Sequence, residues 1–334
     1  MSSFNILSID GGGIKGITSA IVIAALEKAI KVYSGNPAAA LSDYFQMIAG
    51  TSTGSILTGI YLCPDEKGKA RFTAEDAVKL YQNHGSEIFQ SSLFYRFQSL
   101  FGLHRSKFKN VNLYKILDEY FGDIRLSQLR KPCLIPSFEI HSDSAYFFNT
   151  VSAQKDINND FYLKDAILAS TAAPTYFPPV EVASMTHHLY QMVDGGVCCN
   201  NPSLCAFVEA MKMPMFTSFE NVNIFSVGNV SREQTLSYCN ARKWGLVNWA
   251  PPLIKIFMDA STQTVDYQMK MLYNSMEHRN NYIRIEKIVE ESCYIPGMDD
   301  ADAESIQMLK EIGEELVAKH QKEINDFARK ICWE

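Results

Sequence analysis

The sequence predicts an α/β fold in which helices cover a mostly parallel central sheet, with a helical addition toward the C-terminus. Two observations support this prediction. Short apolar runs alternate with segments of helical periodicity over the first two thirds of the chain, and beyond the prolines at 251–252 the pattern is mainly helical. Such alternation favours parallel strands, because a helix between two strands returns the chain to the end of the sheet where it started.

The predicted strands are short runs rich in Ile, Leu, Val and Phe, several of them closed by a turn residue. They are 4–9, 44–49, 133–140, 145–150, 189–193, 222–227 and 282–285. The predicted helices repeat apolar residues every three or four positions. They are 17–32, 55–62, 73–83, 112–121, 163–170 and 203–212, with Thr73 as a helix N-cap. We expect a catalytic core at 1–230 and a helical region at 231–334 that packs on it as one domain.

The composition is that of an ordinary globular protein: 47% of the 334 residues are hydrophobic and the net charge is −6. No chain-wide basic surface exists, so no DNA or RNA partner is expected. The eight cysteines lack zinc-site spacing, so no metal is expected and free thiols are favoured. Neither a signal peptide nor a run of about 20 apolar residues is visible, which predicts a cytoplasmic protein with peripheral membrane contact.

A glycine-rich turn, Gly-Gly-Gly-Ile-Lys-Gly at 11–16, follows the first predicted strand and opens the first helix. It fits the dinucleotide-binding pattern, but that pattern also needs an acidic residue at the end of the next strand, where the chain has none. A nucleotide-binding α/β enzyme is therefore only an alternative. Open backbone amides at a helix N-terminus suit any oxyanion. The candidate residues for binding one are Gly11, Gly12 and Gly13, with Lys15 as a supporting positive charge.

The segment Gly-Thr-Ser-Thr-Gly at 50–54 is a GxSxG motif between a predicted strand and a predicted helix. In that context the turn presents Ser52 as a nucleophile, which needs a base to become reactive. None of the seven histidines has a catalytic setting, and only His187 and His188 are kept in reserve. Asp194 directly follows the predicted strand 189–193 and precedes two glycines. Active sites of open α/β sheets form at such strand ends, so Asp194 is the candidate general base.

Taken in order, these residues resemble the patatin-like phospholipases. The matching motifs are Asp-Gly-Gly-Gly-Ile-Lys-Gly at 10–16, Asp-Tyr-Phe at 43–45, Ile-Ala-Gly-Thr-Ser-Thr-Gly at 48–54, Ala-Ser-Thr-Ala-Ala-Pro-Thr-Tyr-Phe-Pro at 169–178, Asp-Gly-Gly-Val at 194–197 and Asn-Asn-Pro at 200–202. The resemblance covers about residues 4–230. It implies a patatin-like three-layer fold and a Ser-Asp dyad of Ser52 and Asp194. It also implies that the three glycines form the oxyanion hole, with Lys15 where the family often has arginine.

The resemblance implies an acyl hydrolase that needs no metal or organic cofactor and forms an acyl-enzyme on its serine. Its substrate would be a phospholipid or another acyl-glycerolipid at a membrane surface. The segment 91–110 combines aromatic and basic residues without an acid, which suits either an anionic membrane or a cap over the cleft. A catalytically silent binding protein of the same fold is the remaining alternative.

Control of the activity is a further hypothesis, because a phospholipase without an export signal endangers its own cell. The resemblance extends to bacterial antiphage effectors that a cyclic nucleotide activates. Bases and phosphates could be bound by aromatic and basic residues of the C-terminal third. Those residues are Arg242, Lys243, Trp244, Tyr267, Lys270, Tyr273, His278, Arg279, Tyr282 and Arg284. A packed helical cap would explain the same composition. A homodimer is also an expectation.

Overall fold

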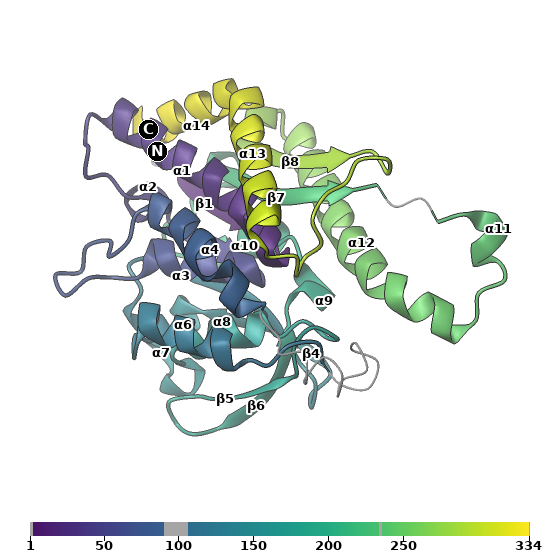
Figure 1. Cartoon of the computed structure of the whole chain (residues 1–334). Coiled ribbons are helices and arrows are strands. Elements are labelled where there is room, and N and C mark those ends of the chain that lie inside the picture. The colour runs from purple at the N-terminus through teal and green to yellow at the C-terminus, as the bar shows by residue number, and fades with distance from the viewer. Residues whose placement is uncertain (1–2, 90–105, 234–235, 334) are drawn as a thin grey trace.

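The structure, a computed structural model, describes residues 3–89, 106–233 and 236–333. Across these residues an eight-stranded sheet forms the centre of the molecule, with helices on both sides (Figure 1). The strands are β1 Phe4–Ile9, β2 Met47–Gly50, β3 Cys133–Glu139, β4 Ser144–Asn149, β5 Val180–Ala183, β6 Leu189–Asp194, β7 Val222–Arg232 and β8 Tyr282–Val289. Their order is β5-β6-β3-β2-β1-β7-β8, with β4 paired to β3.

The helices of the described residues are mostly short and connect successive strands. They are α1 Gly16–Ser34, α2 Leu41–Tyr44, α3 Thr53–Leu62, α4 Ala74–Ile88, α6 Val111–Phe121, α7 Thr150–Lys155, α8 Leu163–Ser170, α9 Gly196–Cys199, α10 Ser203–Ala210, α11 Tyr238–Ala241, α12 Leu246–Ser275, α13 Ala303–Lys319 and α14 Gln321–Trp333. Short 3-10 helices are η1 Gly13–Lys15, η2 Leu126–Gln128, η3 Ile157–Asn159, η4 Phe219–Asn221 and η5 Arg279–Asn281. Thr73 caps α4 as predicted, because its side chain accepts a hydrogen bond from the amide of Asp76.

The predicted fold class is confirmed. β1 pairs in parallel with β2 and β7, β2 with β3, and β7 with β8. The strands β4, β5 and β6 pair antiparallel, so the sheet is mixed but mostly parallel. Several details differ from the sequence prediction. The short elements β5, α2, α7 and α9 are not among the predicted ones, and α12 begins before the prolines at 251–252 instead of after them. The helix tolerates these prolines near its start, where water can reach the carbonyl groups left without an intrahelical donor.

Three layers result because alternate residues of a strand point to opposite faces of the sheet. Leu7 and Ile9 of β1 belong to the core that α1, α3, α4, α6, α8, α13 and α14 cover. Phe4 and Ile6, the alternate residues, belong to a second core under α10 and α12. The sheet is therefore buried on both faces, which explains why its strands are nearly continuous apolar runs.

The C-terminal third shares the main core. β8 extends the sheet beside β7, and residue 230, the predicted boundary, lies inside β7. Phe327 of α14 packs against Phe45 and Phe225, with ring centroids 6.1 and 5.0 Å apart. The region beyond residue 230 thus contributes both a strand and core side chains to the structure around the N-terminal motifs.

The edge of β3 brings two distant segments together. Leu134 of β3 pairs with β2 on one edge and with β4 on the other. Further along β3, Ser137 pairs with Asp194 of β6 on one edge and with β4 on the other. Since β4 occupies one edge throughout, β2 and β6 share the opposite edge. β2 runs parallel to β3 and β6 antiparallel, so their C-terminal ends approach each other from opposite directions.

Candidate active site

The turn between β2 and α3 holds Ser52 in a strained backbone conformation, with φ of 53° and ψ of −121°. The flanking glycines are required for close approach. A Cβ at Gly50 would collide with the carbonyl oxygen of Gly54, and one at Gly54 would collide with that of Ile9. The GxSxG pattern is therefore a steric condition for this tight strand-to-helix turn, which places Ser52 at the N-terminus of α3.

Ser52 and Asp194 are in direct contact although 142 positions separate them. The Ser52 hydroxyl donates a hydrogen bond of 2.6 Å to Oδ2 of Asp194, and both residues are buried. The amide of Gly196 donates to the other carboxylate oxygen, Oδ1, at 2.6 Å. The carboxylate is thereby fixed with one oxygen facing the serine, which is the geometry a general base needs.

Burial raises the pKa of Asp194 from its ordinary 3.8 to about 7, and the hydrogen bonds from Ser52 and Gly196 oppose the rise. An apolar environment disfavours the charged carboxylate, which makes it a stronger base than an exposed aspartate. A pKa close to neutral suits a group that must take and return a proton in one reaction cycle.

Two further hydroxyl groups, which are not among the predicted site residues, fix the turn through hydrogen bonds. Ser170, at the end of α8, accepts a hydrogen bond from the amide of Ser52 at 3.0 Å and donates to the carbonyl of Pro136 at 2.6 Å. Thr51 donates to the carbonyl of Cys199 at 2.7 Å. The motif at 169–178 was a signal for Ser170, but only the structure shows that it ties the nucleophile to β3.

The glycine turn offers two amides, not three. The amide of Gly11 donates to the carbonyl of Asn200 at 3.2 Å, so it is used within the fold. Among the described residues, the amides of Gly12 and Gly13 have no acceptor. The prediction that all three glycines bind an oxyanion is therefore corrected for Gly11, because its N–H points at a neighbouring backbone.

Asn229 fixes the orientation of the Gly11–Gly12 peptide. Its side-chain amide donates to the Gly11 carbonyl at 2.8 Å, and its carbonyl oxygen accepts from Ser19 at 3.0 Å. A trans peptide points its C=O and N–H in opposite directions, so holding the carbonyl toward Asn229 directs the Gly12 N–H away from it. A Cβ at Gly12 would collide with the side-chain amide of Asn229, so any larger residue here requires Asn229 to move.

A buried ion pair anchors the strand end before the glycines. Arg284 of β8 donates to Asp10 at 2.7 Å, to Glu286 at 2.6 Å and to Ser226 at 2.9 Å. Burial raises the pKa of Asp10 to about 6, although the Arg284 charge lowers it. Arg284 was predicted to contact a cyclic nucleotide, and this is corrected: its side chain is only 2% exposed and its partners belong to the chain.

Two other residues of the predicted nucleotide site are also core residues. Tyr273 is buried and donates to the carbonyl of Val222 at 2.9 Å. Its ring stacks on that of buried Tyr282, with centroids 5.9 Å apart. Aromatic and basic residues at helical spacing therefore serve packing here. Activation by a cyclic nucleotide, and a homodimer, stay predictions that the other residues of that set would have to support.

Lys15 follows the glycine turn in η1. Burial, and then the positive charge of Lys255, lower its pKa to about 8. Both causes disfavour the protonated form, so Lys15 loses its proton at a lower pH than a surface lysine does. Its support of an oxyanion stays a prediction.

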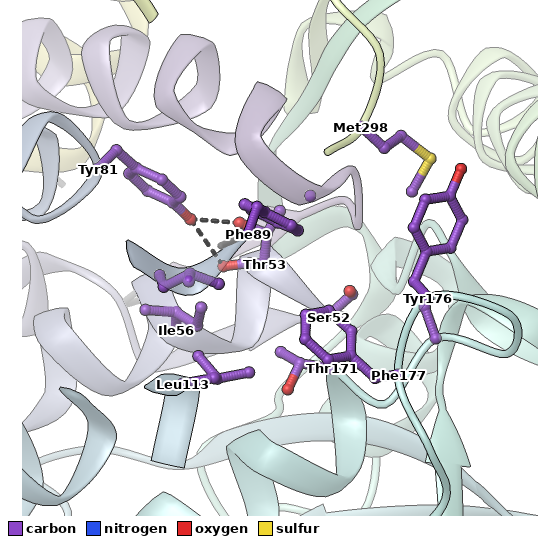
Figure 2. A pocket seen from close by; sticks show the side chains of 13 residues that line it. Ser52, Thr53, Ile56, Tyr81, Phe89, Leu113, Thr171, Tyr176, Phe177 and Met298 are labelled. Atoms are coloured by element: carbon purple, nitrogen blue, oxygen red, sulfur yellow. Dashed lines mark hydrogen bonds between the residues drawn. The ribbon is translucent and has the colours of Figure 1, made fainter. Parts of the chain in front are cut away.

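A pocket leads to Ser52 and is mainly apolar (Figure 2). Figure 2 shows the Ser52 side chain among those of Ile56, Leu113, Phe177 and Met298. The remaining lining comes from Gly13, Thr53, Tyr81, Ile88, Phe89, Thr171, Ala173 and Tyr176. Gly13, one of the two open amides, thus borders the same cavity as the nucleophile. An apolar cavity with a few convergent polar groups suits an acyl chain whose carbonyl reaches the serine.

The reserve histidines lie far from the dyad. His187 and His188 are exposed in the turn before β6, and Asp194 ends that strand. Six residues of extended chain separate His188 from Asp194, which corresponds to roughly 20 Å at about 3.3 Å per residue. Neither ring can serve Ser52 in this arrangement.

Most of the predicted membrane segment 91–110 lies outside the described residues. Of its end, Phe108 is buried against Phe89 and Phe177, and Lys107 forms an ion pair with Asp299. None of the helices in the described part of the chain combines the length and apolarity needed to cross a bilayer.

The fold and the site define an α/β protein with the architecture of a serine hydrolase. The sequence profile of the patatin-like phospholipases matches residues 7–206. Patatin-T5 of Solanum tuberosum is 32% identical over 94% of this chain and 83% of its own length. Patatin-like protein 4 of Arabidopsis thaliana is 30% identical over 96% and 84%. The chain therefore belongs to the patatin-like phospholipase family, whose members are lipid acyl hydrolases.

Family membership alone does not decide activity. A relative named "Probable inactive patatin-3-Kuras 1", also from Solanum tuberosum, is 31% identical over 96% of this chain and 88% of its own length. The family assignment removes the alternative of a nucleotide-binding α/β enzyme. The alternative of a catalytically silent protein with the same fold remains, and it has to be judged from the catalytic groups.

Proposed function

We propose that this protein hydrolyses acyl esters of membrane glycerolipids, as a phospholipase A type enzyme, with Ser52 as nucleophile and Asp194 as general base. The observation that carries the proposal is the 2.6 Å hydrogen bond between the Ser52 hydroxyl and a buried carboxylate whose pKa is about 7. A silent descendant of the family would have no need to keep a strained serine, a fixed carboxylate and open amides together.

The acylation step follows from this geometry. Oγ of Ser52 attacks the ester carbonyl carbon while its proton passes to Oδ2 of Asp194. The carbonyl oxygen becomes an oxyanion, to which the open amides of Gly12 and Gly13 donate hydrogen bonds. The bond to the lipid alcohol then breaks, and the alcohol leaves with the proton that Asp194 returns.

Deacylation reuses the same groups. Water attacks the carbonyl carbon of the acyl-enzyme while Asp194 takes its proton. The tetrahedral intermediate collapses, Oγ of Ser52 recovers the proton, and the fatty acid leaves. The apolar lining of the pocket holds the acyl chain through both steps. Because the carboxylate both removes and returns the proton, this cycle needs no histidine.

Release of fatty acid from phospholipid vesicles tests the proposal. We expect Ser52→Ala to abolish hydrolysis with no loss of folded structure, and a fluorophosphonate probe to label wild type but not this variant. Ser142→Ala, in the exposed turn between β3 and β4, is the matched control and keeps full activity. Wild-type protein that hydrolyses no lipid, or an active Ser52→Ala variant, would contradict the proposal.

A further inference from the structure

The segment formed by α11 and the first half of α12 stands away from the rest of the chain (Figure 1). We call residues 236–258 the arm. Of the residues in 246–268 whose side chains are described, none is buried, and the first buried side chain of α12 is Met269. This half of α12 thus lacks the packing that the second half has.

The helix face turned toward the body is known from its contacts. Met258 lies against the turn at Gly196, Thr262 accepts a hydrogen bond from Asn200 at 2.9 Å, and Met269 is part of the core under α10. Positions 258, 262 and 269 share one face, since α-helices have about 3.6 residues per turn. Through Met258 this face lies next to the dyad, because the amide of Gly196 donates a hydrogen bond to Asp194.

The opposite face of the arm is apolar. Trp249 is nine residues, or about two and a half turns, from Met258 and so points the other way. Leu253 and Ile256 follow Trp249 at spacings of four and three on the same side of the helix, and all three side chains are half-buried. Phe257 beside them is 60% exposed, which is unusual for so large an apolar side chain. An apolar face that turns away from the core needs an external partner.

The charge of the arm indicates which kind of partner this apolar face binds. The arm carries Arg242, Lys243 and Lys255 and neither aspartate nor glutamate, in a chain whose net charge is −6. Lys255 forms an ion pair with Asp259 just beyond the arm, so Arg242 and Lys243 are the charges left for an external partner. Arg242 and Lys243 are exposed. Trp244 and Trp249 pack edge to face with centroids 5.2 Å apart. Tryptophan beside basic residues on an apolar helix is the composition of segments that lie in the headgroup layer of a bilayer.

We propose that the arm docks on the surface of an anionic phospholipid bilayer and presents that surface to the Ser52 pocket. The purpose of docking, which is lipid hydrolysis, rests on the proposed function, whereas the docking itself does not. One contact connects arm and site, because Met258 packs beside the turn that holds Asp194. The charge of Lys255 also lowers the pKa of Lys15, which follows the glycine turn. A lipid drawn from the bilayer at the base of the arm would therefore have only a short way to the nucleophile.

Vesicle cosedimentation in the Ser52→Ala background tests docking without consuming lipid. We expect binding to phosphatidylcholine vesicles that contain phosphatidylglycerol, and weak binding to phosphatidylcholine alone. Each basic side chain at an anionic surface contributes about fivefold in affinity, so Arg242→Gln with Lys243→Gln lowers it about 25-fold. Phe257→Ser lowers binding to both kinds of vesicle, because it removes buried apolar area. The matched control is Lys319→Gln with Lys322→Gln, two exposed lysines on α13 and α14, and it changes binding little.

Activity measurements separate docking from folding and from catalysis. With Ser52 restored, hydrolysis of a water-soluble short-chain ester serves as the reference. We expect vesicle hydrolysis of the Arg242→Gln, Lys243→Gln variant to fall about 25-fold more than this reference, and that of Phe257→Ser to fall more than the reference as well. If the Arg242→Gln, Lys243→Gln variant lost equal affinity for neutral and anionic vesicles, or lost none, the proposal would be overturned. Arm variants that convert a dimer to a monomer in sedimentation velocity, with vesicle binding and vesicle hydrolysis unchanged, would also overturn the proposal. Wild-type protein that binds anionic vesicles as expected but hydrolyses neither substrate would sink the proposed function and leave the docking intact.

Discussion

Replacing Asp194 by asparagine separates the two roles that the structure gives this carboxylate, in catalysis and in stability. The amide has nearly the same shape, so its oxygen can accept from Gly196 and its NH2 group can donate to Ser52. It cannot take a proton from serine. We therefore expect turnover to fall by about 10²–10⁴. In wild type, kcat/KM should rise with pH up to about 7 and then level off, because the base works only when ionised.

The stability effect has the opposite sign. The ordinary pKa of 3.8 applies to the unfolded chain and about 7 to the folded state. Between these values the folded protein keeps a proton that the unfolded chain has released, so the free energy of unfolding falls as the pH rises. The slope is about 1.4 kcal/mol per pH unit. From about pH 5 to about pH 8 this one group should lower the stability of wild type by about 3 kcal/mol, and Asp194→Asn escapes that loss.

Chemical denaturation of both proteins across this pH range measures the effect, because the difference between them cancels the other titrating groups. Asp143→Asn, at an exposed turn position, is the control and should follow wild type. A difference between wild type and Asp194→Asn that stays constant with pH would show that the carboxylate titrates normally. The case for Asp194 as a base of near-neutral pKa would then fail.

Three further predictions test the surrounding groups. Gly12→Ala displaces Asn229 and crowds an open amide, so it should lower turnover by roughly 10²–10³ with little change in KM, and unchanged turnover would argue against this oxyanion hole. His187→Ala and His188→Ala should each keep most of the activity in the vesicle assay, and a loss as large as that of Asp194→Asn would mean that a histidine takes part. Arg284→Met leaves Asp10 buried without its partner and should lower the free energy of unfolding by about 3–5 kcal/mol. Lys79→Met, which removes the exposed pair with Asp76, should change the free energy of unfolding far less than Arg284→Met in the same denaturation experiment.

The local parts of the site could be predicted from the sequence. The GxSxG turn depends on contacts between residues four positions apart, as the collision of a Cβ at Gly50 with Gly54 shows. The strand before it and the helix after it are visible as apolar patterns of the expected period. The motif and its flanking elements are enough to interpret Ser52 as a nucleophile, although the need for glycine at 54 comes from the packing of the turn against Ile9 of β1.

Asp194 is the predicted base, but the structure brings it to Ser52 by a different strand arrangement from the predicted one. The carboxylate was expected at the C-terminal edge of parallel strands, but β6 runs antiparallel to β3. It reaches Ser52 because β2 and β6 end toward each other along one edge of β3. An apolar pattern shows that a segment is a buried strand, but it carries no information on the neighbour or the direction.

What the sequence determined on its own is the set of chemical groups and their local turns: Ser52 between its glycines, the glycine-rich turn, and an alternation that allows little besides an α/β sheet. The tertiary structure alone decided which groups act together. It directs the Gly11 amide to Asn200, leaves those of Gly12 and Gly13 open, and buries Arg284 beside Asp10. The physical reason is that local periodicity fixes which face of an element is buried, whereas partners hundreds of positions apart are selected by packing and by the need to pair every buried charge and amide.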